Sequence, residues 1–482
     1  MERRVHWLML SNAMLCTFFV GIGYMIFIIS LPTLANRLGT DLLGISWAMI
    51  SYQLATISLS LVFGRVGDLY GRPKIFRQGI LVFTLASFLC GLSQDVLQLI
   101  AFRLVQGVGG AMCLSQARAL AMEAVDERSA GKAQALMTTA HYAGFLLGPS
   151  LGGIIIDLIH WRAIFFFLVP MGMAALWLSR SPKSATVAPV LAQDRRPDRA
   201  IDYAGAAMLV VTTIALMAVL DRRIMEKISW GWRNALLSAL AGSFFGFLLR
   251  ERKTPSPILH LALFKIREFT FSALSLLLVT ISHSSTSFVV PFYFQEVLLL
   301  SPTFMGLLFA SGPVFTMTVS PLGGYLADKV GPKVPATAGV ALFSVASALG
   351  LGLRADSHWW VPTLILALSG LGLALFYSPN HAAMIGSVPK EHRGVATGAL
   401  FMTFGLGNAF GVSLGSFLMT AFFRLVTGQH AAAPTPAEPR AFVTALNYTF
   451  LSVTAVALAA VITSLLRETK VKENAARLGK LR

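Results

Sequence analysis

The stretch Gly64-Arg65-Val66-Gly67-Asp68-Leu69-Tyr70-Gly71-Arg72-Pro73-Lys74 is short, charged and punctuated by glycine, and it lies between two long apolar runs. Gly64 and Gly71 permit backbone geometries that are closed to other residues. Asp68 favours a position near a helix N-terminus, and Pro73 suits the first turn of a helix. The stretch is therefore predicted to form a tight loop between two helices at a membrane surface.

The same pattern returns in Gly324-Tyr325-Leu326-Ala327-Asp328-Lys329-Val330-Gly331-Pro332-Lys333, again between apolar runs. Because the first glycines are 324 − 64 = 260 positions apart, the chain is predicted to contain two similar halves. Both copies resemble the loop between helices two and three of major facilitator superfamily transporters. The resemblance implies that these residues gate and pack the cytoplasmic side: Gly64, Asp68, Gly71, Arg72, Gly324, Asp328 and Gly331.

The composition indicates an integral membrane protein. Of 482 residues, 55% are hydrophobic and 13% are charged, and the mean hydropathy is +0.70. Apolar runs of roughly 18 to 28 residues, long enough to span about 30 Å of hydrocarbon, recur fourteen times. They are Trp7 to Leu31, Leu42 to Phe63, Ile75 to Leu92, Val96 to Met122, Ala133 to Ile159, Trp161 to Leu178, Tyr203 to Leu220, Arg233 to Leu249, Phe269 to Phe294, Thr303 to Leu322, Ala336 to Leu353, Trp359 to Tyr377, Val395 to Phe423 and Phe442 to Leu466.

The net charge of +17 has a membrane explanation. With the N-terminus in the cytoplasm, about 29 of the 39 Lys and Arg residues fall on cytoplasmic segments, Arg118 among them, and Arg103 falls inside a span. The first run is too long for a signal peptide and stays as an anchor. We therefore expect a multi-pass protein of the plasma membrane, in a bacterium the cytoplasmic membrane, with both termini cytoplasmic. The basic surplus faces lipid headgroups rather than nucleic acid.

The distance between the repeated loops indicates additional helices. Six spans with their loops need about 200 residues, which is fewer than the 260 observed. This layout resembles the fourteen-helix branch of the superfamily, which includes drug:proton antiporters. It implies an all-α fold with two six-helix bundles, 1–180 and 269–482 with a basic tail, joined by 181–268. The joining segment is expected to hold a cytoplasmic linker, two additional spans and an interfacial helix at Pro257 to Phe264.

The fifth run contains Gly144-Phe145-Leu146-Leu147-Gly148-Pro149-Ser150-Leu151-Gly152-Gly153, which resembles the Gly-x3-Gly-Pro-x2-Gly-Gly signature of antiporters in this superfamily. Small residues at helical spacing let two membrane helices approach closely, and proline bends a helix. A generic packing face is the alternative. The predicted hinge residues are Gly144, Gly148, Pro149, Gly152 and Gly153.

The fourth run contains Arg103-Leu104-Val105-Gln106-Gly107, which resembles the superfamily's Arg-x2-Gln-Gly element. An arginine inside a bilayer costs at least a few kcal/mol and normally faces a water-filled interior. The resemblance implies that Arg103 polarises a proton site or holds a gating network. The alternative is a residue that snorkels to the nearby outer end of its span.

The chain departs at the usual proton site from the branch that it resembles. The resemblance implies an aspartate in the first span, where this chain has Gly23, and Asp157, Asp221 and Glu296 fall at span ends. Histidine titrates near physiological pH, so His283, within a Ser/Thr-rich run, and His141 are the candidate coupling residues. Hydrogen-bonded packing is the alternative role of both, and the neighbouring hydroxyls can equally join helices.

Polar residues at membrane depth complete the candidate site. Gln53, Gln106, Ser284 and Asn408 are candidates for lining a central cavity, or for joining helices. Cys16, Cys90 and Cys113 lie inside spans without metal-ligand spacing, so neither a metal nor a cofactor is expected.

Together these features predict a secondary active transporter that works by alternating access, favoured as a monomer. Its expected function is efflux of lipophilic or cationic small molecules by proton antiport. The alternative is export of a specific lipid, siderophore or metabolite without coupling through a buried carboxylate. A membrane-embedded sensor or enzyme is disfavoured, because the chain lacks a Walker loop, paired intramembrane carboxylates and a large soluble appendage.

Overall fold

The computed structural model describes residues 7–125, 130–179, 203–220, 229–254, 261–389, 393–428 and 438–467, and within them the chain is helical with short turns. All fourteen apolar runs form helices, so the all-α prediction is confirmed. Eleven of the described helical segments are long and apolar enough to cross a membrane. The sixth run is split into two short helices, and the seventh and eighth are not among the eleven, so a count of fourteen spans is not confirmed.

The described helices fall into an N-terminal set, a central pair and a C-terminal set along the sequence. They are α1 (Trp7–Arg37), α2 (Leu42–Tyr70), α3 (Arg72–Leu92), α4 (Val96–Glu123), α5 (Ala130–Leu158), α6 (Ala163–Phe166) and α7 (Leu168–Leu178). A pair follows, α9 (Tyr203–Leu220) and α11 (Trp230–Lys253), then the short η3 (Leu261–Lys265). The C-terminal helices are α12 (Arg267–Phe292), η4 (Tyr293–Val297), α13 (Pro302–Phe309), α14 (Ser311–Val330), α15 (Lys333–Leu349), η5 (Gly350–Gly352), α16 (Trp360–Gly386), α17 (Arg393–Thr427) and α18 (Pro439–Leu465).

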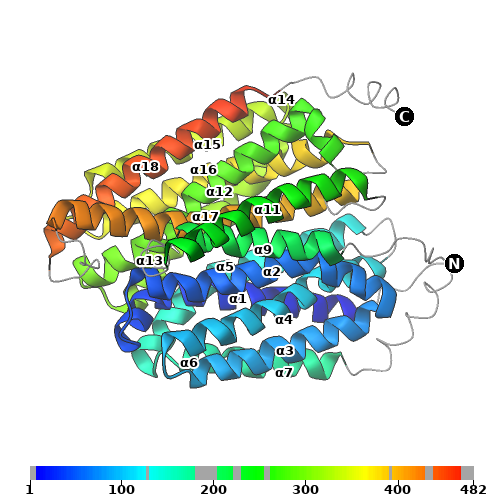
Figure 1. The fold of residues 1–482 in the computed structure, drawn as a ribbon, viewed down its shortest axis with the longest axis horizontal. Helices are drawn as coiled ribbons and strands as arrows, with labels where there is room; N and C mark the ends of the chain where they lie inside the picture. Colours follow the sequence, from blue (N-terminus) through cyan, green and yellow to red (C-terminus); the bar gives the residue numbers. More distant parts are fainter. Residues whose placement is uncertain are drawn as a thin grey trace.

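The helices form two groups, as the repeat in the sequence predicts. Helices α1 to α7 pack on one another in the lower part of Figure 1, and α12 to α18 do so in the upper part. The groups meet where α2 packs on α17 and where α5 packs on α13 and α14. The pair α9 and α11 lies across this boundary, with α9 in contact with both α2 and α17 (Figure 1).

Some predicted features lie outside the described residues. These are the polar linker 181–202, Asp221, the first part of the interfacial helix (257–260) and the basic tail 468–482. The second part of the interfacial segment forms the short η3 helix, which precedes α12.

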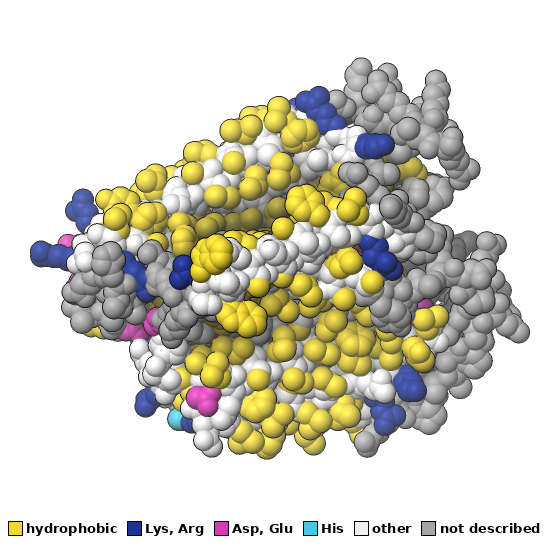
Figure 2. All heavy atoms as spheres, in the orientation of Figure 1, with side chains coloured by type: hydrophobic (Ala, Val, Ile, Leu, Met, Phe, Trp, Pro, Cys, Tyr) yellow, Lys and Arg dark blue, Asp and Glu magenta, His cyan; other side chains and the backbone are white. Residues whose placement is uncertain are grey.

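The surface is divided as a membrane protein requires. In Figure 2 hydrophobic side chains cover the middle of the visible face, and Lys and Arg gather toward its two ends. Helix α1 ends near Asn36, and α2 runs back in the opposite direction, so Asp68 lies at the other end of the bundle from Asn36. In the same way α14 runs back from the end near Gln295, so Asp328 lies at the other end from Gln295. We call the end with Asp68 and Asp328 the loop end.

Chemical labelling is expected to reach the two repeated loops from one side of the membrane. Single cysteines at Tyr70 and Val330, which are 65% and 55% exposed, should react with an impermeant maleimide added on the same side. Cysteines at Leu158 and Leu299, 78% and 80% exposed, should react only from the other side. The native cysteines are buried, which keeps the background low. Labelling of Tyr70 and Val330 from opposite sides would refute this topology.

Candidate functional site

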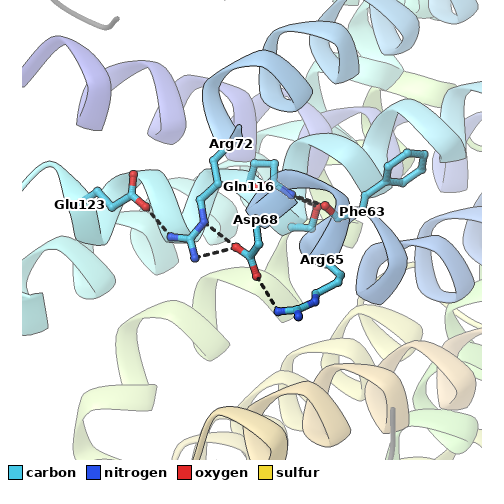
Figure 3. Close-up of polar contacts among 7 residues, drawn as sticks. Phe63, Arg65, Asp68, Arg72, Gln116 and Glu123 are labelled. Carbon is cyan, nitrogen blue, oxygen red and sulfur yellow. Dashed lines mark hydrogen bonds and ion pairs between the residues drawn. The ribbon is translucent and has the colours of Figure 1, made fainter. Parts of the chain in front are cut away.

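The predicted tight loop from Gly64 to Lys74 is wrong in its extent, because α2 continues to Tyr70 and α3 begins at Arg72, which leaves Gly71 alone as the turn. This turn, which we still call the first loop, holds a network of charged groups (Figure 3). Arg72 Nε donates a hydrogen bond to Asp68 Oδ1 at 2.9 Å, and Arg72 Nη2 lies 2.8 Å from the same oxygen. Arg72 Nη1 donates to Glu123 at the end of α4. Arg65 approaches Asp68 Oδ2 at 4.0 Å. These side chains are between 19% and 38% exposed, and solvent weakens each individual pair. The network joins the end of α2 to α3 and to the end of α4, and its gating role stays a prediction.

The second loop repeats the backbone of the first and lacks its network. Gly71 and Gly331 both have positive φ angles, 99° and 84°, at the ends of α2 and α14, which explains the glycine at each position. Pro332 occupies the place of Arg72, and Asp328 is exposed without an ion pair to any described residue. The loop-end network therefore belongs to one half only.

The glycine signature in α5 makes contacts on both sides of the helix. A Cβ atom on Gly144 or Gly148 would lie 2.5 Å from the Phe18 carbonyl oxygen or 2.6 Å from Met25 Cβ, both on α1. A Cβ atom on Gly153 would lie 2.1 Å from the carbonyl oxygen of Pro302, which belongs to the other half. The helix continues through Pro149, whose own carbonyl oxygen closely approaches Gly306 of α13. Small residues thus permit close packing both within a half and between halves.

Hydrogen bonds join the halves at the end opposite the loops, which we call the bonded end. Gln295 Nε2 donates to Thr33 Oγ1 at 3.0 Å, and Asn36 Nδ2 donates to Glu296 at 2.7 Å. The backbone amide of Thr303 donates to Asp157 Oδ2 at 2.7 Å. The carboxylates of Asp157 and Glu296 are therefore engaged in contacts between the halves.

Arg103 lies inside the N-terminal group rather than between the groups. It is 1% exposed, and its Nη1 donates to Gln106 at 2.6 Å, which in turn donates to Ser87 Oγ at 2.7 Å. Its Nε donates to the Ala48 carbonyl at 3.2 Å, and the guanidinium stacks on two aromatic rings at 4.0 and 4.4 Å from their centres. This geometry joins α1, α2, α3 and α4. A role in proton coupling stays a prediction.

The Ser/Thr-rich run of α12 joins helices. Ser284 bonds Asn408 of α17, and Ser282 donates to the Val453 carbonyl of α18. The His283 ring lies 6.3 Å from the ring of Phe343 on α15, so it sits beside another helix of its own half. Its proton-carrying role is likewise still a prediction.

A cluster of aromatic and basic side chains lies where the two groups face each other, and we call it the inter-bundle cluster. The N-terminal group supplies Tyr24, Arg118, His141, Tyr142 and Phe145, and the C-terminal group supplies Tyr377, His381, Phe401 and Phe404.

Contacts within the cluster cross from one group to the other. The Arg118 guanidinium lies 3.6 Å from the centre of the Phe401 ring on α17. Arg118 also interacts electrostatically with His141 on α5 and His381 on α16. Gln53 Nε2 donates to the Tyr24 hydroxyl at 3.0 Å, so one predicted cavity residue lies at the edge of the cluster. Most of these side chains are half-buried rather than fully buried.

Sequence reasoning missed Arg118 and His381. His381 was missed because the predicted apolar run ends at Tyr377, whereas α16 continues to Gly386. Arg118 lies inside the predicted run from Val96 to Met122, but its charge was assigned to the cytoplasmic side. The signal that was available is the polar sequence Ser378-Pro379-Asn380-His381 directly after the run.

The chain matches the family model of the Major Facilitator Superfamily over residues 13–282 and 272–480. It is 28% identical over 411 residues to a riboflavin transporter of Clostridioides difficile, covering 84% of this chain and 87% of that one. It is 27% identical to the multidrug transporter protein MdtP of Bacillus subtilis, covering 86% and 75%, and 27% identical to the multidrug resistance protein Stp of Mycobacterium tuberculosis, covering 87% and 78%.

Solved structures show the same fold at low identity. A bacterial homolog of the human lysosomal transporter Spinster, in an inward-facing and occupied conformation, superposes with a TM-score of 0.69 at 12% identity, covering 97% of this chain and 98% of that one. These matches, with the apolar helices, identify a multi-pass membrane transporter of small molecules rather than an enzyme. The chain belongs to the Major Facilitator Superfamily.

Proposed function

We propose that this protein is a secondary active exporter of lipophilic compounds that works by alternating access with protons as the driving ion. The moving units are the bundles 1–180 and 269–482, and the segment 181–268 with α9 and α11 is an accessory element. The proposed orientation puts the loop end and both termini in the cytoplasm of a bacterium. A monomer is sufficient, because both halves of the site come from one chain.

The observation that carries this proposal is the uneven contact between the halves. Hydrogen bonds such as Thr33 to Gln295 and Asp157 to Thr303 join them at the bonded end. The inter-bundle cluster lies nearer the loop end and keeps half-buried side chains accessible. A carrier that exposes its site to one side must close the other, so this arrangement fits one state of an alternating-access cycle.

The chemistry of the cluster favours lipophilic over cationic substrates. Aromatic rings from both halves provide apolar, polarizable surface. The cluster contains the basic Arg118, which interacts with both His141 and His381, and no described carboxylate lies within ion-pair distance of it. A cationic substrate in the cluster would therefore be repelled by the positive charge of Arg118. The relatives that are named multidrug transporters support an exporter of this broad kind.

Proton coupling is tested in proteoliposomes that contain the purified protein and a fluorescent lipophilic dye. An imposed pH gradient should drive dye movement, and a protonophore should abolish it. Among the variants His141→Ala, His283→Ala and His381→Ala, the one that removes the coupling residue should lose gradient-driven transport and keep dye exchange. Full gradient-driven activity in all three would exclude histidine coupling. A parent protein that ignores the gradient would refute antiport.

Export of one specific metabolite is the second candidate function. The relative named as a riboflavin transporter favours it, because it is 28% identical to this chain over most of both lengths. The dye assay separates the two candidates, since a specific exporter should move few of the structurally unrelated dyes.

A further inference from the structure

Arg118 is a cation at the boundary between the bundles. No carboxylate among the described residues lies within ion-pair distance of it, and its guanidinium packs on the Phe401 ring at 3.6 Å. Its side chain is half-buried, so its N–H groups can be reached. Inside a membrane protein such a charge is expensive, and it normally marks a substrate or ion pathway.

Two histidines flank Arg118 with unused hydrogen-bonding atoms. His141 Nδ1 and His381 Nε2 are buried and have no hydrogen-bond partner. Both rings interact electrostatically with Arg118, and they come from opposite halves. The His141 ring has a further hydrogen bond to the backbone of Thr17. Both nitrogens are fully covered, and a Cβ atom on Gly21 of α1 would lie 3.5 Å from His141 Nδ1, so these atoms do not themselves offer hydrogen bonds to a ligand.

Aromatic rings surround these polar atoms. Phe145 lies 4.5 Å from the His141 ring and stacks on Tyr24 at 5.7 Å between ring centres. On the other side Tyr377 lies 5.7 Å from His381 and 5.8 Å from Phe404. Such rings bind a planar aromatic system, and their arrangement around a guanidinium suits an acidic group attached to it.

We propose that the transported compound is an aromatic acid whose anionic group binds Arg118 at the boundary between the bundles. The acidic group supplies a counter-ion to the guanidinium, and the surrounding aromatic rings from both halves contact the ring system of the compound. This inference rests on the proposed export function and names the substrate class. It also accounts for the absence of a carboxylate from the described part of the cluster, since a carboxylate there would compete with the substrate.

Equilibrium binding to the purified full-length protein tests the inference with three probes: 2-naphthoate, the uncharged 2-naphthamide and the lipophilic cation tetraphenylphosphonium. The parent protein should bind naphthoate about ten-fold or more tightly than naphthamide, because a charged hydrogen bond is lost with the amide. Equal affinity for the two probes would overturn the inference without the need for any variant. Preference for the cation would overturn it as well.

Substitutions then assign the preference to Arg118. Arg118→Gln should abolish the difference between naphthoate and naphthamide, and Arg118→Lys should retain part of it. Arg37→Gln, which removes an exposed arginine at the end of α1, should leave the difference unchanged. The unliganded Arg118→Gln protein should be at least as stable to heat as the parent, because an uncompensated charge is removed. An anion preference that survives in Arg118→Gln would place the anion site elsewhere and refute the proposal.

The binding assay and the transport assay test the two proposals separately. The binding assay uses no gradient, so a naphthoate preference that depends on Arg118 would stand even if the dye assay refutes export. Conversely, gradient-driven dye export by a protein without this preference would leave the export function intact and refute only the anionic substrate class.

Discussion

Replacing Gly153 with leucine is expected to abolish transport while the protein still inserts and folds. A Cβ atom at this position would lie 2.1 Å from the Pro302 carbonyl oxygen and 2.8 Å from Thr303 Cα. Both atoms are backbone of the opposite half, so they cannot move aside as a flexible side chain would. The bundles would be held apart at the bonded end, and the hydrogen bond from Thr303 to Asp157 would be lost. A carrier that cannot close one end cannot alternate.

The measurement is the initial rate of dye transport in proteoliposomes, together with maleimide labelling at the bonded end. A cysteine at Ser150 should become more reactive in the Gly153→Leu background, because the α5 surface is uncovered. Gly242→Leu is the matched control, since a Cβ atom at that position on α11 would meet no atom within 4 Å. Gly148→Leu provides a contrast, because its clash with Met25 lies within one half and should lower folding stability. Normal transport by Gly153→Leu would show that the halves need not meet there.

Replacing Arg103 with alanine is expected to destabilise the N-terminal bundle by about 3 kcal/mol or more, because two hydrogen bonds to a charged group and a large buried side chain are lost together. Gln106 would lose its partner, and the rings of Phe27 and Tyr52 would face a void. The measurement is thermal unfolding of the purified protein in detergent, followed by transport in the fraction that folds.

Two further variants separate stability from coupling. Arg103→Met fills much of the same volume without charge, so it should recover most of the lost stability. Arg103→Lys keeps the charge and loses the planar fork that bonds Gln106 and the Ala48 carbonyl. If the methionine variant folds and transports with normal proton coupling, Arg103 is a packing residue. Loss of coupling in a stable Arg103→Met protein would show a direct role.

The fold could be predicted because its determinants are local. Long apolar runs predict membrane helices by length alone, and the left-handed glycines Gly71 and Gly331 appear in the sequence as a repeated motif. The glycines of α5 likewise signal close helix packing wherever their partners lie. The number of spanning helices was harder to predict from the sequence. The sixth apolar run is interrupted near Phe167, and α11 is not apolar enough to be counted as a span.

The site could be predicted only in part, because it depends on how each helix is rotated about its axis. A helix that is apolar on all sides carries little information about which face meets which neighbour. His283 and Ser284 are adjacent in sequence, yet one lies beside α15 and the other bonds α17. Arg118 and His381 lie in different halves of the chain, and they interact only because the two halves meet.

The position of α9 has a consequence for the route by which an oily compound enters from the lipid. This helix contacts both α2 and α17, so it stands between the surrounding acyl chains and one of the two lateral boundaries of the bundles. Under the proposed export function, a lipophilic compound that approaches this boundary from the bilayer must pass α9, against which α11 packs. The opposite boundary is formed by α5 with α13 and α14 themselves. The two lateral boundaries between the bundles therefore differ, because only one of them is covered by α9. We expect a compound to enter from the bilayer mainly through the other boundary.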